Sequence, residues 1–242
     1  MTKPKPRKTV SFKSVSDQGV KGTDGTNTDE ALLFPTKNTM LLLPLHLPAL
    51  ALFTFKELKS NPLNGLLQGI PTLIAAQVAY GCLITTQFQS SRSKKAGKRE
   101  KESENTPLLL IGSLIISLIL TTPLFAIVIL FGAPLYAHVY ETFLLCTHLA
   151  LVIFYPILVG YKLNFNALIR SFSPTSKDKV LQIVYKNQIL LSSIGGIVGT
   201  WFGVFPIPLD WDRDWQQWPI TLLIGGYGGY FLGSIIALLI GN

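Results

Sequence analysis

The sequence predicts an all-α polytopic membrane protein with six transmembrane helices and a disordered N-terminal tail. Of its 242 residues, 48% are hydrophobic and only 14% are charged, whereas about 25% are charged in a typical soluble domain. The charges are concentrated in the N-terminal region and in two internal segments. Between them lie apolar stretches close to the ~20 residues that an α-helix needs to cross a ~30 Å hydrocarbon core.

Residues 1–37 are predicted to form the disordered tail. They contain few bulky apolar residues and many Lys, Ser, Thr, Gly and Asp, so they cannot bury enough apolar surface to offset the entropy cost of ordering. The extreme N-terminus has no short apolar region of the kind found in a signal peptide, so cleavage is not expected. Residues 38–242 are then left to form the membrane domain.

Six apolar stretches divide the membrane domain into predicted spans. The first contains Pro44 and Pro48, which membrane helices tolerate when neighbouring groups satisfy the freed backbone. The fifth is the shortest, at about 17 residues. The predicted spans cover about residues 38–55, 66–88, 108–131, 135–159, 189–205 and 220–240.

The distribution of basic residues predicts the orientation of the spans. Of the 21 Lys and Arg residues, 18 lie in the tail, the 89–107 loop and the 160–188 loop. Cytosolic loops carry the excess of Lys and Arg, so both termini are predicted to be cytosolic and the 206–219 loop to face the lumen or exterior. The net charge of +8 is then a topology signal that faces anionic lipid. No nucleic-acid partner is expected, because stacking and groove-reading elements are absent.

The loop "PIPLDWDRDWQQWP", residues 206–219, combines acidic residues and tryptophans between two apolar spans. Its tryptophans recur at i, i+4 and i+7, so a short helix would place them on one face. Trp favours the membrane interface, where its ring lies among head groups and its N–H stays hydrated. We interpret the loop as an interface anchor or partner contact formed by Asp210, Trp211, Asp212, Arg213, Asp214, Trp215 and Trp218.

Metal chemistry is the alternative for this loop. The alternating aspartates resemble the start of a calcium loop, but Trp215 stands where that loop needs Gly and Thr221 where it needs Glu. The patterns "DWD" and "DRD" also fit a DxD site for a sugar nucleotide, although a three-residue pattern has little specificity. We predict no catalytic residue, no metal ligand and no cofactor.

A second polar group lies in the fourth predicted span. His138, Glu141 and His148 are offset by three and seven residues, which places them within one arc of a helix. With the helix starting at Pro134, Glu141 would lie about 10 Å deep. A carboxylate within a span usually faces the bundle interior, a partner or a watery cavity. Two interpretations remain: a hydrogen bond between helices, or an intramembrane polar notch for a lipid head group or partner helix.

Glycines recur every four residues in each of the last two predicted spans. Small residues at this spacing allow the backbones of two membrane helices to approach closely. We therefore predict helix packing through Gly195, Gly199 and Gly203 in the fifth span and through Gly225, Gly229 and Gly233 in the sixth.

Several of these motifs together resemble one known family. The block "IPLDWDRDWQQWP", followed by "GGYGGYFLG", resembles the C-terminal motif of the phosphatidylinositol-glycan class F (PIG-F) family. "FGAPL" at 131–135 and "ETFLLCTHLA" at 141–150 are similar to its central block, and "KTVSF" at 8–12 is similar to fungal members. The resemblance is specific from about residue 131 onwards.

This resemblance implies a multi-pass endoplasmic-reticulum protein of glycosylphosphatidylinositol (GPI) anchor synthesis. Family members act as non-catalytic stabilising subunits of the ethanolamine phosphate transferases. The implied partners are the large PIG-O-like and PIG-G-like catalytic subunits, whose lumenal metal-dependent domain adds ethanolamine phosphate to lipid-linked mannose. Membrane lipid, including GPI intermediates, is a further implied partner.

Two alternatives come from the residues themselves. An intramembrane lipid-linked transferase would use Glu141, His138 and the DxD aspartates, but no set of nucleophile, base and orienting group can be assembled from the short lumenal loops. A lipid transporter or scramblase would distribute polar residues over several spans and show an internal repeat. No such repeat is visible in the sequence.

Overall fold

The computed structural model describes residues 39–95, 105–134, 136–171, 184–209 and 213–240. The predicted tail of residues 1–37 lies outside these residues. No strand occurs among them. The elements, in chain order, are η1 (Met40–Leu42), α2 (His46–Ser60), α3 (Pro62–Lys95), α4 (Thr106–Ile119), α5 (Thr121–Leu130), α6 (Val139–Gly160), α7 (Phe165–Ser171), α9 (Gln188–Phe202), η2 (Asp214–Gln216) and α10 (Ile220–Ile240).

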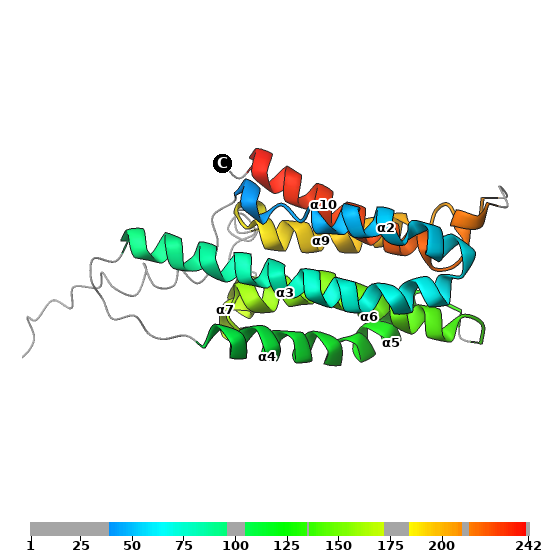
Figure 1. Cartoon of the computed structure of the whole chain (residues 1–242), viewed down its shortest axis with the longest axis horizontal. Coiled ribbons are helices and arrows are strands. Elements are labelled where there is room, and N and C mark those ends of the chain that lie inside the picture. The colour runs from blue at the N-terminus through cyan, green and yellow to red at the C-terminus, as the bar shows by residue number, and fades with distance from the viewer. Residues whose placement is uncertain (1–38, 96–104, 135, 172–183, 210–212, 241–242) are drawn as a thin grey trace, which may run out of the picture.

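The long helices run side by side as a bundle (Figure 1). Helices α2, α9 and α10 lie on one side, α4 and α5 lie on the other, and α3 and α6 lie between them. Helix α6 contacts α3, α4, α5, α9 and α10 and is the most buried of the candidate spans. Its buried residues lie around most of its circumference, which is typical of a helix in the interior of a bundle.

Five helical segments are long and apolar enough to cross a membrane: Met40–Ser60, Pro62–Gln87, Thr106–Leu130, Val139–Gly160 and Ile220–Ile240. They confirm the predicted all-α membrane fold. The remaining predicted span corresponds to α9, which has 15 residues and extends about 22 Å, less than a ~30 Å hydrocarbon core. The turn η1, which precedes α2, and the end of α10 lie at the same end of the bundle (Figure 1).

The opposite end holds three connections, at Asn61, at residues 131–138 and at residues 203–219, and we call it the connection end. The predicted 56–65 loop is wrong, because α2 continues to Ser60 and α3 begins at Pro62. Good helix formers precede Ser60, whereas Pro62 disfavours helical backbone at the residue before it. Asn61 is accordingly extended, and its side-chain oxygen accepts from the backbone N–H of Asn64 at 3.1 Å.

Three further features differ from the sequence prediction. The third span is divided at Leu120 into α4 and α5, because Pro123 has no N–H to donate to the carbonyl one turn earlier. The fourth span was predicted to start at 135 but starts at Val139. Gly132 and His138 have φ values of 102° and 60°, which a right-handed helix cannot include. At the end of the bundle opposite the connection end, α3 continues to Lys95, into the predicted 89–107 loop.

The largest core cluster joins α2, α3, α6 and α10 through buried Leu, Ile, Val and Tyr side chains. Two glycines of α3 allow bulky polar side chains of α6 to approach. A Cβ built on Gly69 would lie 3.0 Å from Cε1 of His148, and one on Gly81 would lie 2.6 Å from the Tyr155 hydroxyl. Side chains at these two positions would displace α3 from α6.

Candidate functional site

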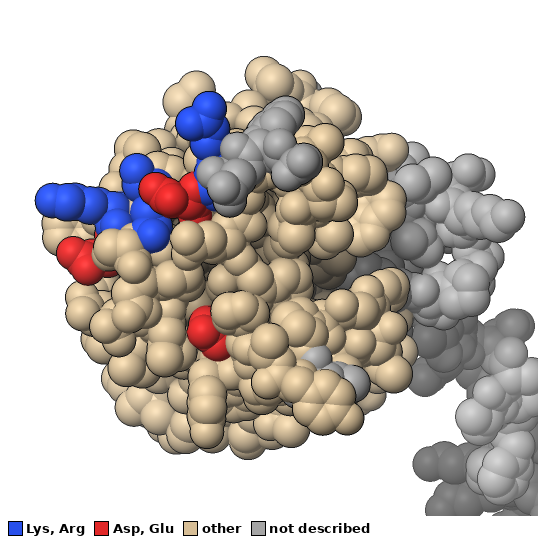
Figure 2. Space-filling model, turned by 90° about the vertical axis from the view of Figure 1, so that its right-hand side faces the viewer, with Lys and Arg blue, Asp and Glu red and all other residues tan. Residues whose placement is uncertain are grey.

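The connection end carries a compact group of charged side chains. The last turn of α2 contributes Lys56, Glu57 and Lys59, and η2 with its preceding residue contributes Arg213 and Asp214. These two segments contact each other. Figure 2 shows basic side chains gathered beside acidic ones on one part of this end, while most of its surface carries no charge. We call these five residues the charged patch.

The segment that carries Arg213 and Asp214 is held by Gln216. The Gln216 amide donates to the carbonyl oxygens of Pro206 and Leu209 at 2.7 and 2.9 Å. Its oxygen accepts from the backbone N–H of Arg213 at 3.0 Å. A side chain that satisfies three backbone groups fixes the path of a short loop, because each unpaired buried group would cost free energy.

Of the tryptophans of this loop, the two described ones, Trp215 and Trp218, do not share the face of one helix. Residues 214–216 form only a single 3-10 turn, and Gln217 is extended. Trp215 lies beside α9 and α10. The Trp218 indole packs against the main core and donates to the Thr142 hydroxyl of α6 at 2.9 Å. Trp211, with Asp210 and Asp212, lies outside the described residues.

The structure does not test the DxD alternative. Within the described residues, no three His, Cys, Asp or Glu side chains are grouped to hold a metal ion. Asp210 and Asp212, on which that alternative depends, are not among these residues. Asp214 is exposed at the surface of the charged patch.

The three residues of the predicted polar notch separate into two places. The imidazole Nδ1 of His138 lies 3.3 Å from the Glu141 carboxylate, and both lie at the connection end. Helix α6 starts at Val139 rather than at Pro134, so Glu141 belongs to its first turn and the distance of about 10 Å counted from Pro134 does not apply. His148 lies ten residues after His138 and is buried, about 15 Å further along the helix.

His148 joins three helices through both nitrogens of its ring. Nε2 lies 2.9 Å from the Leu66 carbonyl oxygen of α3, and Nδ1 lies 2.6 Å from the Tyr227 hydroxyl of α10. A carbonyl only accepts, so Nε2 carries the proton and Nδ1 accepts from Tyr227. Because both ring nitrogens are occupied, His148 has a structural role within the bundle.

All six predicted glycines lie where α9 meets α10, the most extensive helix pair among the described residues. A Cβ built on Gly199 would lie 2.8 Å from Cα of Gly229, and the carbonyl oxygen of Gly225 would be closer still. A Cβ on Gly195 would lie 3.1 Å from Cα of Gly233, and one on Gly203 would lie 2.8 Å from Cα of Leu222. The backbones touch directly, with no room for side chains.

A polar seam in the bundle interior was not predicted. It comprises His46 of α2, Gln77 and Tyr80 of α3, and Tyr230 of α10, all at least partly buried. The Tyr80 hydroxyl donates to the Leu42 carbonyl at 2.7 Å, and the His46 and Tyr80 rings are 5.1 Å apart. Tyr230 lies beside Tyr80, but its hydroxyl has no hydrogen bond of acceptable geometry within the described residues. The sequence does contain one sign of this seam: Gln77 is an amide in the middle of an apolar run, and such residues often form hydrogen bonds between membrane helices.

Comparison with known proteins identifies similar chains. The model of the GPI biosynthesis protein family Pig-F matches residues 42–238. A Debaryomyces hansenii protein named glycosylphosphatidylinositol anchor biosynthesis protein 11 is 47% identical, with 96% of each chain covered. A Candida albicans protein of the same name is 35% identical, with 97% of this chain and 95% of that protein covered. A Schizosaccharomyces pombe PIGF/3-ketodihydrosphingosine reductase fusion protein is 38% identical over 53% of this chain and 23% of the fusion. No solved structure matches.

Proposed function

The chain belongs to the GPI biosynthesis protein family Pig-F, and from this membership we propose that it is a non-catalytic subunit that stabilises ethanolamine phosphate transferases. In this proposal its partners are the large PIG-O-like and PIG-G-like catalytic subunits. The complex transfers ethanolamine phosphate to mannose of the GPI precursor. The chain itself contributes membrane helices and a contact surface.

The observation that carries this proposal is the brevity of the connections at the connection end. Helices α2 and α3 are joined by Asn61 alone, and residues 131–138 and 203–219 form the other two connections. None is long enough to fold as a separate catalytic domain, which typically needs at least about 50 residues. In the proposed complex, the catalytic domain therefore belongs to the partner subunit, and this chain stabilises that subunit.

The charged patch and Trp215 are the proposed contact for that partner. Gln216 fixes the backbone that presents Arg213 and Asp214, so this part of the backbone needs little ordering when a partner binds. Arg and Trp are among the residues that most often dominate the binding energy of an interface. We include Asp210, Trp211 and Asp212 in this proposed contact because they continue the same loop.

The proposed location is the endoplasmic-reticulum membrane, with both termini in the cytosol. The connection end then faces the lumen, where the catalytic domain of the partner would lie. The excess of Lys and Arg on the other side supports this orientation. The turn η1 and the end of α10 at one end of the bundle agree with it.

Purification from its own membrane in mild detergent, followed by mass spectrometry, tests the proposal. We expect a large transferase with a lumenal domain in stoichiometric amount. The purified chain alone, with and without Mn²⁺ or Mg²⁺, should transfer no ethanolamine phosphate. Metal-dependent transfer by the chain alone would instead establish an intramembrane enzyme, and recovery of the chain without any transferase would contradict the subunit role.

A further inference from the structure

The connection between α5 and α6, residues 131–138, exposes large apolar side chains at the connection end. Its sequence contains no Lys, Arg, Asp or Glu. With the adjoining turns of α5 and α6 it presents Leu130, Phe131, Tyr136 and Tyr140, which are 86%, 83%, 100% and 77% exposed. We call these four residues the apolar corner. An exposed apolar group of this kind marks a site of contact with a protein or a membrane.

The apolar corner continues the lipid-facing side of α5. Ile127, Leu130 and Phe131 are all exposed and follow one face of the helix, at i, i+3 and i+4. They end the span Thr106–Leu130, which is the least buried of the candidate spans. Its 25 residues extend about 37 Å, about 7 Å more than a ~30 Å hydrocarbon core. The end of α5 therefore reaches the head-group layer.

The backbone at the end of α5 satisfies its own carbonyl groups. The N–H of Ala133 donates to the Val128 carbonyl oxygen at 3.2 Å, and the N–H of Gly132 donates to that of Ile129 at 2.9 Å. With Gly132 at a φ of 102°, these two hydrogen bonds form a Schellman motif. Carbonyl groups that are already paired lower the cost of placing this helix end where water is scarce.

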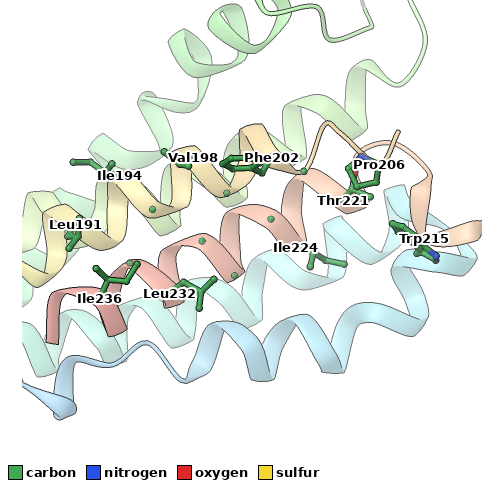
Figure 3. A pocket seen from close by; sticks show the side chains of 17 residues that line it. Leu191, Ile194, Val198, Phe202, Pro206, Trp215, Thr221, Ile224, Leu232 and Ile236 are labelled. Atoms are coloured by element: carbon green, nitrogen blue, oxygen red, sulfur yellow. The ribbon is translucent and has the colours of Figure 1, made fainter. Parts of the chain in front are cut away.

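The charged patch lies on the other side of the bundle. It belongs to α2 and η2, and Figure 2 shows its charges gathered in one part of the connection end. Next to it, Trp215 lines the open face of α9 and α10 together with Thr221, where α10 begins (Figure 3). Trp favours the depth of the head groups, so the exposed Arg213 and Asp214 mark the part of this end that stays in water.

We propose that the apolar corner lies in the head-group layer of the leaflet at the connection end, while the charged patch projects beyond that layer. The bundle is then tilted towards α5. Helices α2 and α5 lie on opposite sides of the layer formed by α3 and α6, so two interaxial distances of about 8–10 Å separate them. A tilt of about 20°, the average for membrane helices, shifts one side against the other by about 5–7 Å. One head-group layer is about as thick.

This seating goes beyond the proposed subunit role and does not depend on which partner is bound. Lipid is its committed occupant, because the corner is uncharged and continues the exposed side of a span. The tyrosines suit the head-group layer, since each has an apolar ring and a hydroxyl that stays hydrated.

Spin labels at single cysteines measure this seating. Tyr136→Cys reports on the apolar corner and Lys56→Cys on the charged patch, in a chain whose native Cys82 and Cys146 are replaced by Ala. The labelled full chain is placed in phosphatidylcholine vesicles, alone and in the complex with which it is purified. Electron paramagnetic resonance gives the collision rates of each label with oxygen, which enters the membrane, and with a neutral nickel chelate, which stays in water.

The ratio of oxygen to nickel collision rates should be at least about threefold higher at position 136 than at position 56, because an apolar layer disfavours a polar chelate. Equal ratios would overturn the proposal, since the corner would then project into water. Low collision rates with both reagents at position 136 in the complex would also overturn it, and would show that a partner subunit covers the corner.

Two double variants test whether the apolar side chains hold this position. Leu130→Asp with Phe131→Asp should lower the ratio at position 136 by at least about twofold, because charged side chains are costly in an apolar layer. Ser60→Asp with Gln217→Asp adds the same charge at exposed positions outside the corner and should leave the ratio unchanged. An unchanged ratio in the Leu130 and Phe131 variant would contradict the proposed anchoring.

Discussion

The direct contact between α9 and α10 predicts that a single methyl group at Gly199 destabilises the protein. A Cβ at this position would lie 2.8 Å from Cα of Gly229, about 0.6 Å short of the 3.4 Å at which ordinary contact begins. The obstacle is backbone rather than a flexible side chain, so the helices must separate.

The magnitude follows from two opposing terms. Overpacking of a tight contact typically costs about 1–3 kcal/mol. Replacing Gly by Ala within a helix gains about 0.8–1 kcal/mol from propensity. Gly228→Ala shares that gain, but a Cβ at Gly228 would meet nothing within 4 Å. The difference between the two variants therefore isolates the packing term, and we expect Gly199→Ala to be less stable than Gly228→Ala by about 1–3 kcal/mol.

Reversible unfolding of the purified chain in mixed micelles of increasing SDS content, followed by tryptophan fluorescence, measures this difference. Gly199→Ala should unfold at a lower SDS fraction than the wild type, and Gly228→Ala at an equal or higher one. Equal midpoints for the two alanine variants would refute the reasoning, because they would show that the helices are free to separate without cost. In cells, Gly199→Leu or Gly229→Leu should lower the abundance of this chain and, under the proposed function, of its partner.

Three further predictions concern the topology, the polar seam and the loop. Glycosylation acceptors inserted near residue 212 should be modified and acceptors near residue 96 should not; the reverse pattern would invert the proposed orientation. Tyr80→Phe, which removes the hydrogen bond to Leu42, should destabilise the chain in the same SDS assay by about 0.5–1.5 kcal/mol, whereas Tyr230→Phe, which removes a hydroxyl without a suitable partner, should be neutral or stabilising. A larger loss for Tyr230→Phe would mean that its hydroxyl pairs with the neighbouring Tyr80 or Ser193 hydroxyl. Trp218→Ala should destabilise the chain itself by about 2–3 kcal/mol, less than for a fully buried Trp, since its partly buried indole packs against the core, whereas Trp215→Ala should release the proposed catalytic partner from an intact chain. Asp212→Asn should leave both the complex and anchor synthesis almost unchanged; loss of synthesis with the complex intact would indicate a metal site.

Hydropathy predicted the membrane helices well, because the number of apolar residues that cross a bilayer is set by its thickness. The glycine spacing placed Gly195 and Gly229 on facing surfaces for a similar reason, since a repeat of four residues follows one face of a helix. Boundaries were less predictable. Lys56 and Glu57 appeared to end α2, yet charged residues are good helix formers, and the helix continues until the Asn61–Pro62 pair stops it.

The polar residues were the hardest to assign from sequence. His138 and Glu141 pair with each other at the start of α6, but the partners of His148 come from elsewhere in the chain. His148 bonds to α3 and α10, 82 and 79 residues away in sequence. Periodicity within one helix carries no information about such distant partners. Trp218 is a second example. Its residue type predicts a place at the membrane interface, but its indole N–H donates to the Thr142 hydroxyl of α6, 76 residues away in sequence.

The two hydrogen bonds of His148 have a mechanical consequence. They connect α6 to the backbone of α3 on one side and to Tyr227 of α10 on the other, in a buried environment. If α3 were to slide along α6 by one helical turn, about 5.4 Å, the Leu66 bond would break where no water can replace it. Rocking of α10 would break the Tyr227 bond in the same way. The three helices should therefore move as one rigid body, and any motion within the complex should occur at the edges of this body or in its partner.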